Sequence, residues 1–400
     1  MMNYIKLSEL TVSLESGSRP KGGVSSDGIP SIGGEHIKSD GTFKFDNMKY
    51  VPEDFFNNLK KGVIDRGDIL IVKDGATTGK VAFVDNTFPY KNAAINEHVF
   101  KLKINNEMVL PKYVFYYLYS RDGNRQLMKD FRGATVGGIT KNFLNLVQIP
   151  ISRKLEFQNK IVTLLDKAQE LIDKRKAQIE ALDQLTQSVF LEMFGDPATN
   201  PKKWSMGFIK DLALKTQYGT SKKANQGGGK YPILRMNNIT YEGHWDFTDL
   251  KYVDLDDKET EKYLVHKGEL LFNRTNSKEL VGKTAVYRFE EPMAFAGYLV
   301  KLVPNEKANA EFISVYLNSK YGKSILHSMA KNIVGMANIN AEELKSIKIY
   351  IPPKQLQDQF AGIVQKIESQ RELFKKGLVE LEKNFNSLMQ RAFKGELFND

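Results

Sequence analysis

GDILIVKDGATTGKVAFV, residues 67–84, returns in altered form as GELLFNRTNSKELVGKTAVY, residues 268–287. The stretch IPSIGGEHI at 29–37 has the same relation to YPILRMNNI at 231–239. An offset of about 200 residues is far longer than one solenoid unit, so it indicates a duplicated domain together with its connector. The chain is therefore predicted to contain two similar modules that differ in detail.

Each module has the sequence pattern of a mixed α/β domain. Short alternating apolar runs, bounded by glycine-bearing turns, predict strands at 68–73, 80–85, 98–104, 269–273, 283–289 and 298–303. One helix is expected in each copy, at 113–120 and at 311–319.

A long heptad stretch follows each module. Apolar residues at alternating steps of four and three predict two helical seams without proline. The seam residues are Ile161, Leu165, Ile172, Ile179, Leu182 and Val189 in the first stretch, and Ile363, Ile367, Phe374, Leu381, Phe385 and Leu388 in the second. Each seam carries one polar residue, Arg175 or Gln370, of the kind that can fix register.

Two arrangements of these stretches are open. They could be independent amphipathic helices on separate cores, or they could pair with each other. Pairing is favoured because both run for about 40 residues and occupy equivalent places in the repeat. The predicted boundaries are 1–154 for the first module, 155–194 for the first helix, 195–353 for the second module and 354–400 for the second helix.

The positive charge is concentrated in the modules. Residues 1–154 hold 22 Lys and Arg against 16 Asp and Glu, a net +6, and residues 195–353 hold 23 against 18, a net +5. Two basic globular modules favour two surfaces for polyanions. An excess of lysine on an ordinary soluble surface is the alternative.

Composition also limits the compartment. The chain has no Cys, which excludes disulfides and thiolate metal sites and is compatible with a reducing cytoplasm. The first residues, MMNYIKLSEL, lack the pattern of a signal peptide, and no run approaches the length of a membrane span. We expect a cytoplasmic protein.

Sequence signals for catalysis are missing. Residues 277–284, SKELVGKT, nearly match a phosphate-binding loop, but Ser277 stands where glycine is required and the next residues alternate like a strand. The five histidines are scattered, with no pair at metal-ligand spacing. The carboxylates of Asp68 and Glu269 recur beside turns, where a turn role is favoured over acid catalysis. We therefore expect neither catalytic residues nor a metal site in this chain.

Four pairs of repeat-related loops combine small, hydroxyl, amide and cationic residues. They are 17–23 with 219–223, 35–36 with 235–238, 73–80 with 273–278, and 132–138 with 331–338. Small residues let a backbone approach phosphates, Lys and Ser/Thr position a duplex, and Arg and Asn can read base edges. Ordinary surface turns are the alternative for any single loop. The candidate DNA contacts are Arg19, Lys21, Glu35, His36, Lys73, Thr77, Thr78, Lys80, Arg132 and Thr135 in the first copy, and Ser221, Lys222, Arg235, Asn237, Asn238, Arg274, Thr275, Asn276, Lys278, Lys331 and Asn338 in the second.

Taken together, these features resemble the specificity subunit of a type I restriction-modification enzyme. The resemblance rests on the repeated stretches above, on INEHVFKL at 95–102, on FGDP at 194–197, and on the tails that begin IPISRKLEF at 149 and IPPKQLQDQF at 351. It covers essentially the whole chain, in the order domain, helix, domain, helix.

The resemblance implies an α+β fold with a pseudo-two-fold internal repeat. Two mixed α/β target recognition domains would be separated by two long helices that pair as an antiparallel coiled coil. Each domain would read one half of a bipartite, asymmetric site in double-stranded DNA. The helices would set the spacing and dock modification subunits, expected to be two.

The resemblance also implies that this subunit is not itself an enzyme. S-adenosylmethionine, ATP and Mg would be used by the modification and restriction subunits, and this chain would need no cofactor. The rival interpretation is a protein-binding coiled-coil scaffold that does not read DNA.

Overall fold

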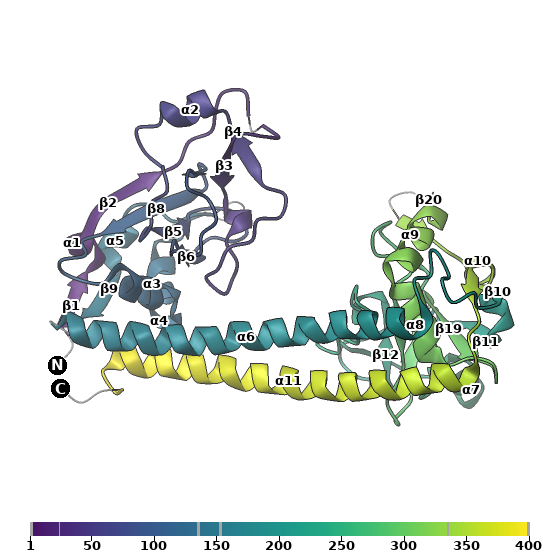
Figure 1. The fold of residues 1–400 in the computed structure, drawn as a ribbon. Coiled ribbons are helices and arrows are strands. Elements are labelled where there is room, and N and C mark those ends of the chain that lie inside the picture. The colour runs from purple at the N-terminus through teal and green to yellow at the C-terminus, as the bar shows by residue number, and fades with distance from the viewer. Residues whose placement is uncertain (1–2, 24, 134–136, 152–153, 334–335, 398–400) are drawn as a thin grey trace. The chain divides into compact units, whose positions relative to one another are not determined.

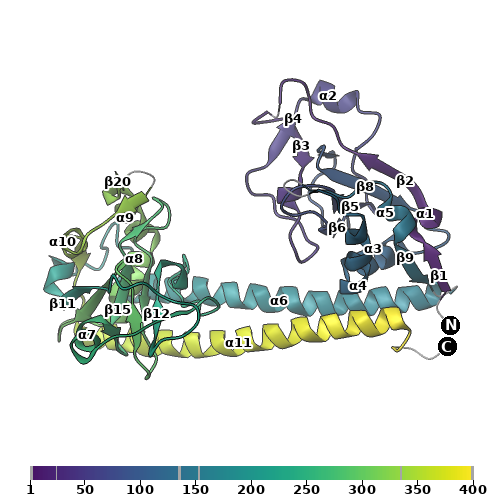
Figure 2. The ribbon, with the colours of Figure 1, turned by 180° about the vertical axis from the view of Figure 1, so that it is seen from behind.

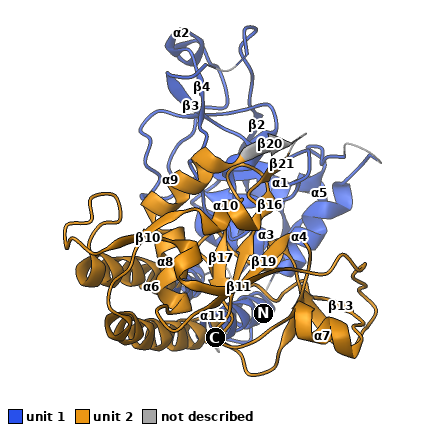
Figure 3. Cartoon of the chain, turned by 90° about the vertical axis from the view of Figure 1, so that its right-hand side faces the viewer, with its two compact units in different colours: residues 1–175, 377–400 blue, residues 176–376 orange. Residues whose placement is uncertain are grey.

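The computed structural model describes residues 3–23, 25–133, 137–151, 154–333 and 336–397. The chain forms two compact units, residues 1–175 with 377–400 and residues 176–376 (Figure 3). Both long helices pass from one unit to the other, so each unit contains part of each helix.

The first unit is built on a four-stranded antiparallel sheet in the order β2 (Thr11–Ser16), β8 (Val99–Ile104), β5 (Ile69–Val72) and β6 (Val81–Phe83). All four residues of β5 are buried because the sheet is covered on both faces. Ile69 and Ile71 face the larger core, and Leu70 and Val72 face a second one. This double burial explains the uninterrupted apolar run ILIV.

Two smaller sheets complete the strands of this unit. β4 (Lys49–Val51), β3 (Ile29–Ile32) and β7 (Ala94–Ile95) form one, with β3 and β7 parallel. β1 (Asn3–Lys6) and β9 (Gln148–Ile151) form the other.

The helices of the first unit join its main sheet to α6 (Leu155–Phe194). α3 (Pro111–Tyr119) and α4 (Arg121–Leu127) lie between the sheet and α6 (Figure 1 and Figure 2). The Leu110 N–H donates to Gln158 Oε1 at 2.9 Å, which ties the start of α3 to α6. The remaining short helices are α1 (Leu7–Leu10), α2 (Glu53–Asn57), α5 (Phe143–Leu146), η1 (Gly34–His36) and η2 (Met128–Asp130).

The second unit repeats this plan. Its main antiparallel sheet has the order β11 (Ala213–Tyr218), β19 (Leu299–Pro304), β15 (Leu270–Asn273) and β17 (Thr284–Val286). A second sheet has the order β13 (Lys251–Val253), β12 (Tyr231–Leu234), β18 (Met293–Phe295) and β14 (Leu264–Val265). β10 (Met206–Phe208) pairs with β22 (Lys348–Tyr350) as β1 pairs with β9.

The helices of the second unit also correspond to those of the first. α8 (Ala310–Asn318) matches α3, and the Asn309 N–H donates to Gln357 Oε1 at 2.9 Å, as Leu110 does to Gln158. The other elements are α7 (Asp257–Tyr263), α9 (Lys320–Met329), α10 (Ala341–Lys345), η3 (Ile209–Asp211), η4 (Met236–Asn238), and the short strands β16 (Thr275–Asn276), β20 (Lys331–Ile333) and β21 (Met336–Asn338). The predicted duplication and the mixed α/β class are confirmed.

The two long helices, α6 and α11 (Lys354–Lys394), pack together within each unit. In the first unit Ile161 and Leu165, near the start of α6, share a core with Phe385 and Met389, near the end of α11. In the second unit Phe190 and Phe194, at the end of α6, share a core with Phe360, near the start of α11. Early residues of one helix thus meet late residues of the other, so the helices are antiparallel as expected.

The predicted seam is correct along α6 but needs two corrections along α11. Ile161, Leu165 and Ile172 are buried, and Ile179, Leu182 and Val189 are partly buried. On α11, Ile367 and Phe385 are buried, and Phe374, Leu381 and Leu388 are partly buried. Ile363 is 37% exposed, whereas its neighbour Val364 is 1% exposed and faces the core.

The second correction concerns the polar residue of that seam. Gln370 is exposed, and the buried polar residue is Arg371, with 2% of its surface exposed. The hydrogen bonds that Gln158 and Gln357 accept show that residue 158 corresponds to 357. Ile161 therefore corresponds to Phe360 rather than to Ile363.

The recurring turn carboxylates have a structural role. Asp68 accepts a hydrogen bond from the Asp65 N–H at 2.8 Å, and Glu269 accepts one from the His266 N–H at 2.7 Å. Burial raises the pKa of Asp68 to about 6. The residues of 284–286 form the strand β17 rather than a helix, as expected for a sequence that is not a phosphate-binding loop.

Candidate nucleic-acid interface

In the first unit the loop between β5 and β6 brings together all four predicted loops. Lys73 Nζ lies 3.4 Å from Ser16 Oγ, at the end of β2 where the 17–23 loop begins. Thr77 Oγ1 donates to Gly34 O at 3.5 Å, which reaches the 34–36 loop. The Gly75 N–H donates to Gly137 O at 3.3 Å, which reaches the 132–138 loop. Sequence reasoning had no distance information, so this convergence comes from the structure.

The cations around these loops differ in how firmly they are held. Arg19 pairs with Glu97 at 2.6 Å, and the side chain of Arg132 is 71% exposed with Asp130 at 3.7 Å. Lys73 stacks over the Phe100 ring, 5.6 Å from its centroid. Lys21 is exposed and Lys80 is partly exposed. Weakly held, exposed cations of this kind can move to a phosphate at little cost.

Several candidates make contacts that hold the loops in shape. His36 is fully buried, and its Nδ1 accepts a hydrogen bond from the Gly33 N–H at 2.9 Å. Burial lowers the pKa of His36, so the imidazole is held neutral. Thr78 Oγ1 donates to Gly75 O at 2.7 Å inside its own loop, and Glu35 pairs with Lys49 at 2.6 Å.

The same convergence occurs in the second unit. Thr275 Oγ1 donates to Asn338 Oδ1 at 2.9 Å, and β16, β21 and β20 form a three-stranded ribbon. Arg274 lies over the Tyr218 ring, 4.9 Å from its centroid, and thereby joins the end of β11. Lys283, which follows the loop, donates to Met236 O at 2.8 Å and so reaches the 235–238 loop.

The predicted base readers of this unit are partly engaged within the protein. Arg235 Nη2 pairs with Asp249 Oδ2 at 2.8 Å, and Asn237 Nδ2 lies 3.3 Å from the same atom. Asn238 is buried and donates to Asp246 O at 2.8 Å, so it supports the loop. Lys222 pairs with Glu259 on α7 at 2.5 Å.

The guanidinium of Arg274, another predicted base reader of this unit, is oriented by an aromatic ring. Its Nε is buried and has no hydrogen-bond partner among the described residues, and its Nη1 lies 3.5 Å from Gly297 O. Stacking on Tyr218 orients the guanidinium plane without using its donors. Asn276 and Lys278 follow on the same loop with partly exposed side chains, and Ser221 is exposed.

One pair of exposed rings beside these loops is not among the predicted DNA contacts. His98 and Tyr298 occupy equivalent places just before β8 and β19, and both are exposed. His98 Nδ1 lies 2.5 Å from Asp74 Oδ1, and the Arg274 N–H donates to Tyr298 O at 3.0 Å, so both adjoin the central loop of their unit. The sequence signal for this pair is a ring-bearing side chain, imidazole or phenol, at the same repeat position in both copies.

Two candidate residues receive no structural account of their side chains. Thr135 lies outside the described residues. Lys331 begins β20, where only the backbone is described. Within the described residues no group of three or more His, Cys, Asp and Glu could hold a metal ion, and no helix is long and apolar enough to cross a membrane.

Comparison with known proteins agrees with this architecture. The sequence profile of the type I restriction modification DNA specificity domain matches residues 26–182 and again residues 201–383. The chain therefore belongs to the family of type I restriction-modification DNA specificity proteins, whose members are non-catalytic subunits.

Individual relatives show the same relation. The EcoKI specificity subunit of Escherichia coli K12 is 23% identical over 395 residues, which cover 93% of this chain and 83% of that relative. The putative MjaX specificity subunit of Methanocaldococcus jannaschii is 30% identical over 201 residues, which cover 50% of this chain and 47% of that relative.

Among solved structures, the type I restriction-modification S subunit from M. genitalium has a TM-score of 0.55 at 17% identity, covering 100% of this chain and 96% of that one. A chain from a study of complex assembly and conformational transition in the type I system has a TM-score of 0.56 at 18% identity, covering 99% and 98%. These similarities show the fold.

Proposed function

We propose that this chain is the DNA sequence-specificity subunit of a type I restriction-modification complex and that each unit reads one half of a bipartite, asymmetric site. The recognition domains would be residues 1–154 and 195–353, with 155–194 and 354–400 as spacer helices. The chain would act where its DNA lies, in the cytoplasm.

One observation carries the proposal: the same cluster of loops occurs in both units, with the same backbone arrangement but different side chains. In the first unit the central loop presents Lys73, Thr77 and Thr78, and in the second the matching loop presents Arg274, Thr275 and Asn276. Arginine suits guanine and asparagine suits adenine in the major groove. A constant frame with divergent contacts is what readers of two different half-sites require.

The outer faces of the long helices support the docking of partner subunits. In the first unit Leu171 is 54% and Val379 50% exposed, and in the second Leu185 is 46% and Leu373 61% exposed. Exposed apolar residues at several turns of a helix mark a protein interface more than a solvated face. We assign these faces to modification subunits, two per complex, which would bring S-adenosylmethionine. Restriction subunits would bring ATP and Mg.

The seam residues buried between α6 and α11 would act indirectly. They hold the two helices in register, so they would fix the spacing of the two recognition domains without touching a partner.

Selection from a pool of randomised duplexes tests the proposal. The full chain, assembled with its modification subunits, should enrich two unlike half-sequences separated by a fixed gap. Arg274→Ala should relax the base preference in one half-site only, because a bidentate arginine contact serves one base pair. The expected loss of discrimination between bases is about 1–3 kcal/mol. Lys258→Ala, on the exposed face of α7, is the control and should leave both halves intact.

Enrichment of one continuous motif, or of no motif, would refute the proposal of two recognition domains and favour the scaffold alternative. Equal relaxation of both halves by Arg274→Ala would show that this loop does not serve one half-site.

A further inference from the structure

A cavity of about 1260 Å³ lies wholly within the second unit. It is lined by the last third of α6, the 241–244 loop, the 278–283 loop, the end of α8 and the start of α9. Apolar side chains such as Leu191, Val315 and Leu326 share its walls with hydroxyl, amide and charged groups. An apolar lining with a few polar groups is typical of cavities that bind small molecules.

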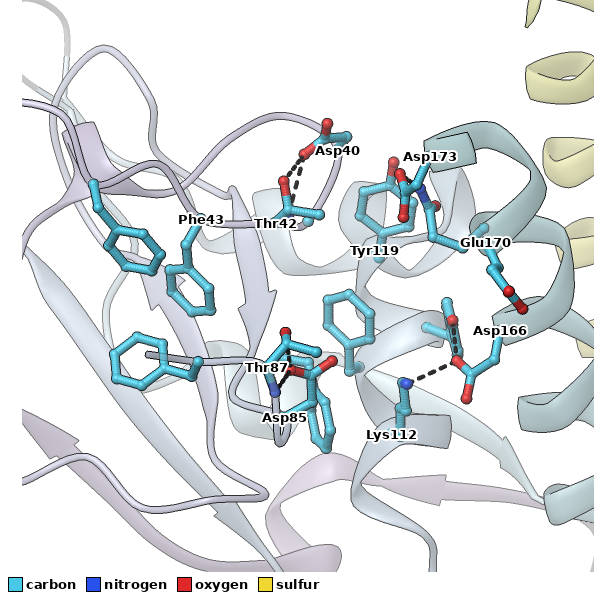
Figure 4. Close-up of a pocket in the computed structure, with 17 residues that line it drawn as sticks. Asp40, Thr42, Phe43, Asp85, Thr87, Lys112, Tyr119, Asp166, Glu170 and Asp173 are labelled. Atoms are coloured by element: carbon cyan, nitrogen blue, oxygen red, sulfur yellow. Dashed lines mark hydrogen bonds and ion pairs between the residues drawn. The ribbon is translucent and has the colours of Figure 1, made fainter. Parts of the chain in front are cut away.

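The corresponding place in the first unit is smaller. The cavity there has a volume of about 440 Å³, and its walls include the rings of Phe115, Tyr116 and Tyr119 on α3 (Figure 4). Phe385 of α11 packs against two of these rings, with its centroid 6.3 Å from those of Tyr116 and Tyr119. Four aromatic side chains of the chain itself therefore occupy part of this place.

The internal repeat identifies what replaces these rings in the second unit. α8 matches α3 residue by residue, because the serine that follows each helix caps the next helix in the same way. Phe194 packs against Phe312 at 4.9 Å as Phe393 packs against Tyr113 at 5.1 Å, so the end of α6 takes the place of the end of α11. The rings are thus replaced by Ser314, Val315, Asn318 and Thr186, which all line the larger cavity.

One of these replacements leaves a buried acceptor without a donor. Asn318 has 9% of its surface exposed, and its Nδ2 donates to Thr284 O at 2.7 Å. That hydrogen bond fixes which end of the amide is the oxygen. The Oδ1 atom is buried and has no hydrogen-bond partner in the part of the chain that the structure describes. A buried acceptor without a donor costs free energy, so a ligand that brings an N–H to this wall would be bound more tightly.

Three lysines that line the cavity, Lys278, Lys320 and Lys323, make no ion pair among the described residues. Lys320 begins α9, a helix of 10 residues whose first N–H groups and dipole favour an anion. Lys323 donates to Tyr241 O at 2.9 Å and lies over the Tyr241 ring, 3.4 Å from its centroid. Burial lowers the pKa of Lys323 to about 8, and an anion beside it would favour the charged form.

Five carboxylates also line the cavity, and four of them already pair with cations or accept hydrogen bonds. Asp183 and Glu368 pair with Arg371. The other two engaged carboxylates are Asp196, which accepts a hydrogen bond from the Ala198 N–H at 2.9 Å, and Glu279, whose pKa is lowered by hydrogen bonds. The fifth, Glu242, is exposed. Three lysines without ion pairs thus outweigh one such carboxylate, which favours an anionic ligand.

We propose that this cavity binds a nucleoside phosphate. The base lies where the four rings lie in the first unit, and its exocyclic amine donates to Asn318 Oδ1. The phosphate lies at the start of α9, beside Lys320 and Lys323. The proposal does not depend on the proposed function.

Isothermal titration calorimetry with the full chain tests this site. AMP, CMP and GMP each carry an exocyclic amine, whereas UMP has none and inorganic phosphate has no ring. At least one of the first three should bind saturably, with one-to-one stoichiometry and at least about tenfold more tightly than UMP and inorganic phosphate. Binding of none of the three, or equal affinity for UMP or for inorganic phosphate, would overturn the proposal.

A variant that restores the rings of the first unit locates the bound nucleotide. Thr186→Phe, Ser314→Phe and Asn318→Tyr together place rings where the first unit has them and leave the net charge unchanged. This variant should bind the nucleotide at least about tenfold more weakly. Equal binding by the folded variant would place the nucleotide outside the cavity and overturn the proposal.

A second variant keeps the outcome decisive if the first does not fold. Lys320→Gln with Lys323→Gln removes the two cations at the start of α9 and should weaken nucleotide binding at least about tenfold. Lys258→Gln with Lys262→Gln removes the same charge from two exposed positions of α7 and is the matched control, which should agree with the wild type within about twofold. Equal losses in the two variants, or no loss in either, would overturn the proposal.

Discussion

Replacing Glu368 by Gln tests the charge cluster that ties the second recognition module to the long helices. Glu368 lies 3.3 Å from Arg371, 3.5 Å from His244 and 3.7 Å from Arg288. Burial alone would raise the pKa of this carboxyl, but its cationic neighbours outweigh burial and lower the pKa from 4.5 to about 2. At about 1.4 kcal/mol per pH unit, this difference corresponds to about 3 kcal/mol of stabilisation at neutral pH.

The pH dependence has a definite sign. A carboxyl whose pKa is lowered by folding contributes its full stabilisation above pH 4.5 and loses it as the pH falls toward about 2. Glu368→Gln should therefore unfold at lower urea concentration than the wild type at pH 7, by about 3 kcal/mol, with a difference that shrinks below pH 4.5.

Tryptophan fluorescence is a suitable assay because both tryptophans, Trp204 and Trp245, belong to the second unit. Glu372→Gln is the matched control. Glu372 lies one turn further along α11 with its side chain 59% exposed, and its pair with Lys375 should contribute less than about 1 kcal/mol. A loss below about 0.5 kcal/mol for Glu368→Gln, or equal losses in both variants, would refute the reasoning.

Three other predictions concern stability and DNA binding. The carboxylates of Asp183 and Glu368 raise the pKa of His244 above 6.5 despite its burial. The stabilisation of the folded protein by protonated His244 is therefore complete below pH 6.5 and is lost as the pH rises through the raised pKa. The melting temperatures of His244→Gln and wild type should differ more at pH 6 than at pH 9. Phe360→Ala should lower the free energy of unfolding of the second unit by about 3 to 5 kcal/mol in urea titrations, because this buried ring packs against two others; a loss under about 1 kcal/mol would contradict the packing described. Arg132→Ala should lower affinity for all duplexes alike and reduce the slope of log K against log salt by about 0.9, and an unchanged slope would remove Arg132 from the phosphate contacts.

Periodicity and duplication were sufficient to predict much of the fold. The strands around Ile69 and Leu270 alternate or run apolar between glycine turns, and the same pattern appears twice, which makes each copy a check on the other. The seam of α11 was harder, because Ile363 and Val364 are adjacent apolar residues and a spacing of three or four accepts either. The tertiary contacts that bury Val364 decide between them.

The candidate interface was predictable in outline and not in detail. Loop chemistry singled out Lys73 and Arg274 as candidates, but burial of His36 and Asn238 depends on packing that residue type does not reveal. The charge cluster of the second unit is assembled from residues as distant in sequence as Asp183 and Arg371. Such sites become visible only when the fold has brought their parts together.

The most direct test of the central claim is a map of methylated adenines across the source genome, with this gene present and with it deleted. We predict a split motif of two unlike half-sequences with a fixed gap, present in the first genome and lost from the second. Methylation unchanged by the deletion would contradict the assignment of this chain as the subunit that selects the sequence.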